Sequence, residues 1–101
     1  MARYSITFVS DAKAEIRNLK AADRGVVVDA IKTHLVDRPG IQEGDKKVLR
    51  GLTPPWIQVR PVWQLTVVPF RVFYDVDEDN KEVVINAVRR KPSGKTTKEI
   101  L

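Results

Sequence analysis

Residues 63–77 read WQLTVVPFRVFYDVD, two stretches with apolar residues at alternate positions that meet at one proline. A period of two is typical of a β-strand that buries one of its faces. The expected buried faces carry Trp63, Leu65 and Val67 in the first stretch and Phe70, Val72, Tyr74 and Val76 in the second. Pro69 has no backbone N–H to donate, so it favours a turn or bulge between two antiparallel strands.

Two helices are predicted between a first strand at residues 3–9 and this pair of strands. Ser10 is a suitable N-cap for a helix that ends near Ala21. Asp23 can cap a second helix, which Pro39-Gly40 stops. Apolar residues at helical spacing are Ala12, Ile16 and Leu19 in the first helix and Val26, Val27, Ala30, Ile31 and Leu35 in the second. We expect the two helices to form a hairpin.

The remaining segments complete an α+β fold. Residues 40–55 are loop-like, although residues 46–52 can form a further turn or a short strand. The stretch Asp77-Glu78-Asp79-Asn80, with three acidic residues, predicts a hairpin turn before a last strand at residues 82–88. Thr96 and Glu99 have the spacing of a capping box and allow a short C-terminal helical turn. The expected order is β-α-α-β-β-β in a single domain of residues 1–101, with the helical hairpin packed on one face of a mainly antiparallel sheet and the other face open.

Positive charge is concentrated in the second half of the chain. Residues 46–101 contain eleven Lys and Arg against six Asp and Glu, a net charge of +5, whereas residues 1–45 contain seven of each. A localised positive charge attracts polyanions through counterion release. Nucleic acid is therefore the first partner to expect.

Composition excludes several classes of protein. The chain has no cysteine and one histidine, His34, so we expect neither a metal site nor any other cofactor. We expect His34 to be a solvated or partly packed residue of the second helix rather than a general base. A phosphate-binding glycine loop is absent from the sequence, as is an apolar run of about 20 residues, the length of a membrane helix. The N-terminus does not have the architecture of a secretion signal, and we expect a cytoplasmic protein.

Arg71 and Phe73 are the most informative candidates for a site, because the alternation directs both to the face without helices. Arg71 has two interpretations: a solvent-facing arginine paired with a carboxylate, or a phosphate contact, for which the planar guanidinium is suited. Phe73 has two as well, since it can stack on a base or bind a partner protein.

Two basic clusters flank the three expected C-terminal strands. The candidates for RNA binding in these clusters are Lys46, Lys47 and Arg50 before them and Arg89, Arg90, Lys91 and Lys95 after them. If the sheet brings both clusters to one rim beside Arg71, they form a positive concavity for phosphates. The alternative is that the C-terminal cluster is only a solubilising tail.

The chain resembles the RelE/ParE superfamily of bacterial toxins from type II toxin–antitoxin systems over nearly its whole length. Residues 63–77 are similar to the family pattern of a Trp-x-Leu strand, a short turn and aromatic-Arg-Val-x-Tyr-x-Val. Residues 47–52, KVLRGL, resemble its Lys-x-Leu-x-Gly signature, and residues 84–91, VINAVRRK, resemble its final strand.

The resemblance implies a RelE-like mRNA interferase, which cleaves messenger RNA in the ribosomal A site with the RNA's own 2′-hydroxyl as nucleophile. Arg71 then matches the arginine at the scissile phosphate, and Lys91 or its neighbour Arg90 matches a second cationic catalytic residue. Two features depart from the family's nucleases. Val62, Gln64 and Thr66 stand where they have basic residues, and the tyrosine or histidine expected after Lys91 is missing.

These departures leave two other functions open. The ParE branch inhibits DNA gyrase without nuclease activity, and a third interpretation is a binding module that has lost catalysis. The toxin versions imply an antitoxin partner whose acidic and apolar segment covers the basic concavity or displaces the C-terminal helix. They also imply that operator DNA is bound only through the antitoxin complex.

Overall fold

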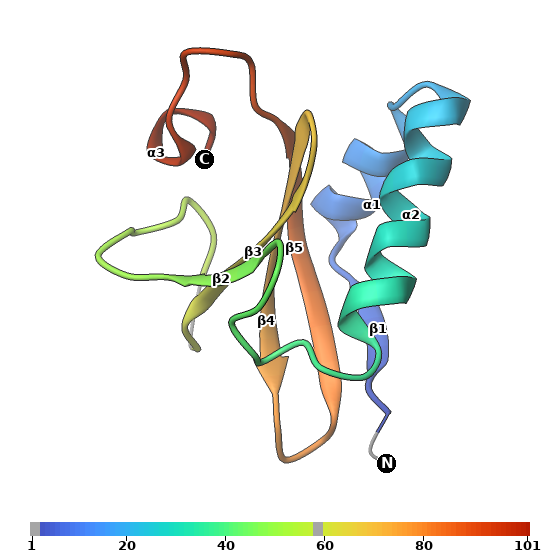
Figure 1. The fold of residues 1–101 in the computed structure, drawn as a ribbon, viewed down its shortest axis with the longest axis vertical. Coiled ribbons are helices and arrows are strands. Elements are labelled where there is room, and N and C mark those ends of the chain that lie inside the picture. The colour runs from blue at the N-terminus through green and yellow to red at the C-terminus, as the bar shows by residue number, and fades with distance from the viewer. Residues whose placement is uncertain (1–2, 58–59) are drawn as a thin grey trace.

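The computed structural model describes residues 3–57 and 60–101, which form one sheet with helices on both of its sides (Figure 1). The strands are β1 (Ser5–Phe8), β2 (Lys46–Leu49), β3 (Val62–Val67), β4 (Phe70–Asp77) and β5 (Glu82–Arg90). The helices are α1 (Ser10–Arg17), α2 (Ala21–Leu35) and α3 (Thr97–Ile100). The predicted order is confirmed, and of the two alternatives for residues 46–52 the strand is the one that forms.

The sheet has the strand order β1-β5-β4-β3-β2, so the two strands richest in apolar residues lie at its centre. β1 runs parallel to β5, and the other three pairings are antiparallel. A two-residue turn at Val68-Pro69 joins β3 to β4, as the alternation of residues 63–77 predicted. β4 and β5 shift register between Phe73 and Tyr74.

The main core lies between the sheet and the hairpin of α1 and α2, which covers one sheet face (Figure 1). The predicted faces of β3 and β4 are confirmed, because their alternate apolar residues pack against this hairpin. The helices contribute the buried residues Ala12, Ile16, Val27, Ile31 and Leu35. Val26 was predicted to belong to this stripe, but 56% of it is exposed, so it lies on the solvent side of α2 while its neighbour Val27 is buried.

Helix boundaries differ from the sequence prediction by a few residues. The N-caps are Val9 and Lys20, rather than Ser10 and Asp23, and neither makes a side-chain capping hydrogen bond. α1 ends at Arg17, because Asn18 and Leu19 already form the bend toward α2. The described residues include no helix long and apolar enough to cross a membrane.

The second face of the sheet is partly covered, which corrects the prediction that it is open. Here a small core of Val62, Phe73 and Ala87 packs against Leu49, Trp56, Ile100 and Leu101. The cover comes from the β2–β3 loop and from α3, which Figure 1 shows on the side of the sheet opposite the hairpin. The capping box of α3 is confirmed: Glu99 N donates to Thr96 Oγ1 at 3.3 Å, and Thr96 N donates to Glu99 Oε1 at 3.2 Å.

Tyr74 connects the sheet to the segment that follows α2. Its ring is completely buried, and its hydroxyl donates to the backbone carbonyl of Pro39 at 2.8 Å. Burial raises the pKa of Tyr74 above its ordinary value, so the hydroxyl remains a donor.

We predict that Tyr74→Phe lowers the free energy of unfolding by about 2 kcal/mol, because the buried Pro39 carbonyl loses its partner. Urea denaturation measures the change. Tyr4→Phe is the matched control, since its hydroxyl bonds the exposed Glu78, and we expect a loss below about 0.5 kcal/mol. Equal losses in the free energy of unfolding would show that the buried hydrogen bond of Tyr74 stabilises the fold no more than the exposed one of Tyr4.

Candidate anion-binding site

Arg71 and Arg89 lie directly opposite each other on β4 and β5. Alternation along β4 places Arg71 on the same sheet face as the buried Phe73, away from the helical hairpin. Lys91 follows β5 by one residue, and its backbone N–H donates to the carbonyl of Pro69 at 2.7 Å. The continued alternation returns Lys91 to the face of Arg89. We call Arg71, Arg89 and Lys91 the cationic triad.

Arg71 is the second residue of β4, next to the β3–β4 turn. Its Nη1 donates to the carbonyl of Phe70 at 3.0 Å, and in residues 3–57 and 60–101 this is its one side-chain hydrogen bond. The residue is half-buried, and the other N–H groups of its guanidinium remain for a ligand. A phosphate can therefore bind without displacing a carboxylate from Arg71.

Arg89 is held from two sides. Its Nε donates to the carbonyl of Ile100 in α3 at 3.1 Å, and its Nη1 forms an ion pair with Glu15 of α1. α3 is itself attached to the sheet, because Thr97 Oγ1 donates to Gln64 Oε1 at 3.0 Å. Arg89 therefore joins the cationic triad to α3.

Lys46 does not belong to this site, which corrects the sequence expectation. It pairs with Leu65, on the face that packs against the helices, and only 6% of it is exposed. Its Nζ donates to the carbonyls of Arg38 at 2.6 Å and His34 at 3.2 Å, and Glu43 lies 3.5 Å away. The buried ammonium satisfies carbonyls at the C-terminal end of α2 and cannot reach RNA.

Phe73 is also unavailable, although its face was predicted correctly. It is completely buried, and its ring centre lies 6.1 Å from that of Trp56. The local pattern could not reveal this cover, since it comes from the β2–β3 loop and from the C-terminus. Phe73 therefore belongs to the small core and does not stack on a base.

The other predicted RNA-binding residues are distributed around the molecule. Lys47 is exposed and pairs with Gln64, so it shares the face of the cationic triad. Arg90 is exposed and pairs with Phe70, which places it on the helix face instead. Arg50 and Lys95 are exposed in loops, and Lys95 lies 3.7 Å from Glu99. The two basic clusters thus converge only in part.

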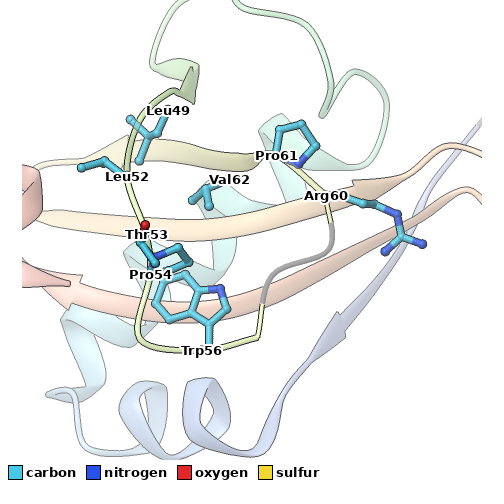
Figure 2. Close-up of a pocket in the computed structure, with 8 residues that line it drawn as sticks. All are labelled: Leu49, Leu52, Thr53, Pro54, Trp56, Arg60, Pro61 and Val62. Carbon is cyan, nitrogen blue, oxygen red and sulfur yellow. The ribbon is translucent and has the colours of Figure 1, made fainter.

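A pocket of about 320 Å³ lies beside the β2–β3 loop (Figure 2). It is lined by Leu49, Leu52, Thr53, Pro54, Trp56, Arg60, Pro61 and Val62. Arg60 points away from the other lining residues (Figure 2), and its Nη2 lies 3.0 Å from Asp77 while its Nη1 lies 3.7 Å from Asp75. The one cation of the pocket is therefore engaged by carboxylates, and the pocket is not the anion site.

Asp75 is a buried carboxylate that sequence reasoning did not single out. Burial raises the pKa of Asp75 above the ordinary carboxyl value, and the charge of Arg60 opposes this shift. Asp77, two residues later, shows the opposite effect, because hydrogen bonds from Asn80 lower the pKa of Asp77. Among the described residues, no group of three His, Cys, Asp or Glu side chains is arranged to hold a metal ion.

The geometry describes a small α+β protein with a cationic patch on one sheet face, and solved structures show the same fold in RelE toxins. The toxin of the RelBE2 toxin–antitoxin complex from Mycobacterium tuberculosis is 21% identical with a TM-score of 0.72, over 90% of this chain and 94% of that chain. The isolated E. coli RelE toxin is 20% identical with a TM-score of 0.70, over 91% of this chain and 88% of that chain.

The archaeal RelE–RelB complex from Pyrococcus horikoshii OT3 contains a third similar chain, 16% identical with a TM-score of 0.67, over 95% of this chain and 100% of that chain. No protein-family profile and no curated protein sequence matches the chain. At these identities the likeness establishes the fold, and it confirms the RelE-like architecture expected from the sequence.

Lys46 and Lys47 provide a direct test of the corrected assignment. We predict that Lys46→Met lowers the free energy of unfolding by about 2 kcal/mol, since carbonyls near the end of α2 lose a buried donor. Lys47→Met is the matched control and is expected to change stability by less than about 0.5 kcal/mol. Chemical denaturation of both variants measures this, and a Lys46 variant as stable as the wild type would contradict the structural role.

Asp75 and Asp77 are predicted to affect the pH dependence of stability with opposite signs. A raised folded-state pKa means that folded Asp75 binds its proton more tightly than the unfolded chain does. Its contribution therefore stabilises at low pH and is lost as pH rises from about 3.9, the unfolded value, through the folded pKa. Asp77 has a lowered pKa, so its contribution is present above about 3.9 and is lost as pH falls.

Urea denaturation of Asp75→Asn and Asp77→Asn across the acidic range tests these signs. Relative to the wild type, the Asp75 variant should gain stability as pH rises from about 3.9 through the raised pKa of Asp75. The Asp77 variant should lose stability relative to the wild type as pH rises from the lowered pKa of Asp77 to about 3.9. The same sign in both variants would contradict the environments described for the two carboxylates.

Proposed function

We propose that this protein is the toxin of a type II toxin–antitoxin system and acts in the cytoplasm as a RelE-like mRNA interferase. The observation that carries the proposal is the pairing of Arg71 and Arg89 across β4 and β5 on one sheet face, beside Lys91. Two guanidinium groups at neighbouring positions suit a phosphodiester, whose oxygens accept hydrogen bonds from both. The RelE fold and the basic second half of the chain support the same function.

The proposed reaction breaks one RNA phosphodiester. The 2′-hydroxyl gives up its proton to solvent water and its oxygen forms a bond to the adjacent phosphorus, while the bond from phosphorus to the 5′-oxygen breaks. The products are a 2′,3′-cyclic phosphate and a 5′-hydroxyl. Arg71 stabilises the extra negative charge that develops on the phosphate oxygens in the transition state. Lys91, which carries protons on its ammonium group, is our candidate to protonate the 5′-oxygen.

The single histidine and both tyrosines of the chain lie away from this site. His34 is exposed on α2, Tyr4 bonds Glu78, and Tyr74 is buried against the helices. An efficient acid–base pair contributes roughly 10²–10⁴-fold to rate, so a site without a histidine or tyrosine is expected to be slow. Cleavage on the ribosome, where the message is held in place, offsets part of that loss through orientation of the phosphate.

We predict that Arg71→Ala lowers kcat for cleavage of ribosome-bound messenger RNA by about 10²–10³, because one transition-state donor is lost. Primer extension on programmed ribosomes measures the rate. Arg90→Ala is the matched control, since it removes an equal charge from the opposite face, and a loss below about threefold is expected. Intact message at high concentrations of wild-type protein would reject the nuclease function, and equal losses in the two variants would reject the site.

Inhibition of DNA gyrase in the manner of ParE is the second candidate function. It is favoured by the neutral side chains of Gln64 and Thr66, which line the site face of β3 beside Phe73 and Arg71. A supercoiling assay with purified gyrase separates the two functions. Inhibited supercoiling together with uncleaved message would support the second candidate, and the absence of both activities would indicate a binding module.

The proposed partner is a cognate antitoxin. Two of the similar structures are complexes of a RelE toxin with its antitoxin. We propose that an acidic and apolar segment of the antitoxin orders on binding and covers the cationic triad, and that the complex reaches operator DNA through the antitoxin. In the absence of the antitoxin, the partners are messenger RNA and the ribosome.

A further inference from the structure

Glu15 is the carboxylate that contacts the cationic triad. It projects from α1, and its Oε2 forms the ion pair with Nη1 of Arg89. Its second oxygen, Oε1, accepts a hydrogen bond from the backbone N–H of Val88 at 3.0 Å. The side chains of Glu15 and Arg89 are only 25% and 29% exposed, so the contact is largely shielded from water.

The fold explains why a carboxylate is needed at this position. β1 pairs with β5 only from Glu82 to Ile85, so the rest of β5 is a free edge on that side. The N–H of Val88 points out from this edge and requires an acceptor. Glu15 meets two donors with two acceptor oxygens. A glutamine has one acceptor oxygen and would direct its NH₂ group at one of the two donors.

We propose that Glu15 is a positioning residue that fixes the orientation of Arg89 so that Arg89 and Arg71 bind one phosphate together. The proposal rests on the proposed function for its chemistry, and on the contacts of Glu15 for its geometry. Two bonds, from Nη1 to Glu15 and from Nε to the carbonyl of Ile100, hold the guanidinium of Arg89. An arginine already ordered in the free protein loses little rotamer entropy when a ligand binds.

Glu15 also offsets an unfavourable pairing. Arg71 and Arg89 are like charges at directly opposite positions of an antiparallel pair, an arrangement that destabilises a sheet. The carboxylate neutralises one of the two charges while no phosphate is present. Loss of the carboxylate therefore has two opposite consequences: Arg89 becomes poorly oriented, and the site becomes more positive.

These consequences affect different kinetic constants. Orientation is needed most in the transition state, so Glu15→Gln should lower kcat for message cleavage roughly tenfold. Positive charge favours RNA binding in general, so KM should remain unchanged or decrease. A purely structural role for Glu15 lowers the amount of folded enzyme and does not produce this division between kcat and KM.

The experiment compares Glu15→Gln with Glu82→Gln, a matched control at the other end of β5, where Oε2 of Glu82 accepts from the hydroxyl of Thr7 at 2.8 Å. Both variants are also made in an Arg89→Ala background. If Glu15 acts through Arg89, Glu15→Gln has no further effect on kcat once Arg89 is removed. Equal losses in both backgrounds, or an equal loss in the Glu82 variant, would overturn the proposal.

A second readout needs no RNA and so separates this inference from the proposed function. In the wild type the Nε–H of Arg89 is bonded to Ile100, and its ¹⁵N–¹H resonance should exchange slowly with water. Glu15→Gln should speed this exchange at least severalfold, whereas Glu82→Gln should not. Unchanged exchange in the Glu15 variant would overturn the positioning role even if the wild type cleaves message. If the wild type leaves message intact and the exchange changes as expected, only the proposed function fails.

Discussion

The pairing of β4 with β5 is the constraint on which the rest of the structure depends. Both strands bury alternate residues against the α1–α2 hairpin, and Val72, Tyr74 and Ile85 retain no exposure at all. A shift of one residue in either strand would expose this core, so the register is strongly fixed. The same register directs Arg71 and Arg89 to the opposite face and sets them side by side. The position of the cations is therefore a consequence of the hydrophobic core.

The sheet face that carries the cations is only partly covered. α3 and the β2–β3 loop lie over this face (Figure 1) and cover part of it with a small apolar core. The three residues of the cationic triad are only half-buried. Arg89 contacts both layers of the molecule, through Glu15 of α1 and through the carbonyl of Ile100 in α3. A ligand that binds Arg89 therefore meets a side chain that contacts with α1 and α3 already hold in place.

Local periodicity was enough to predict the element order, the faces of β3 and β4, and the side to which Arg71 points. It could not predict contacts that depend on distant segments. Phe73 is buried by residues from the β2–β3 loop and the C-terminus, and Lys46 points to the helices because of the register of β2 on β3. Glu15 gave no signal in the sequence, since its role arises only because β1 is too short to cover the edge of β5.

The proposed chemistry requires Arg71 and Arg89 to hold a single RNA phosphate on the face opposite the α1–α2 hairpin. The most direct measurement is a crystal structure of the protein with a short single-stranded RNA whose 2′-hydroxyls are methylated, so that it binds but cannot be cleaved. We expect one phosphate within hydrogen-bonding distance of both guanidinium groups, with Lys91 beside its 5′-oxygen. RNA bound along the helix face around Arg90, with the two arginines uncontacted, would contradict it.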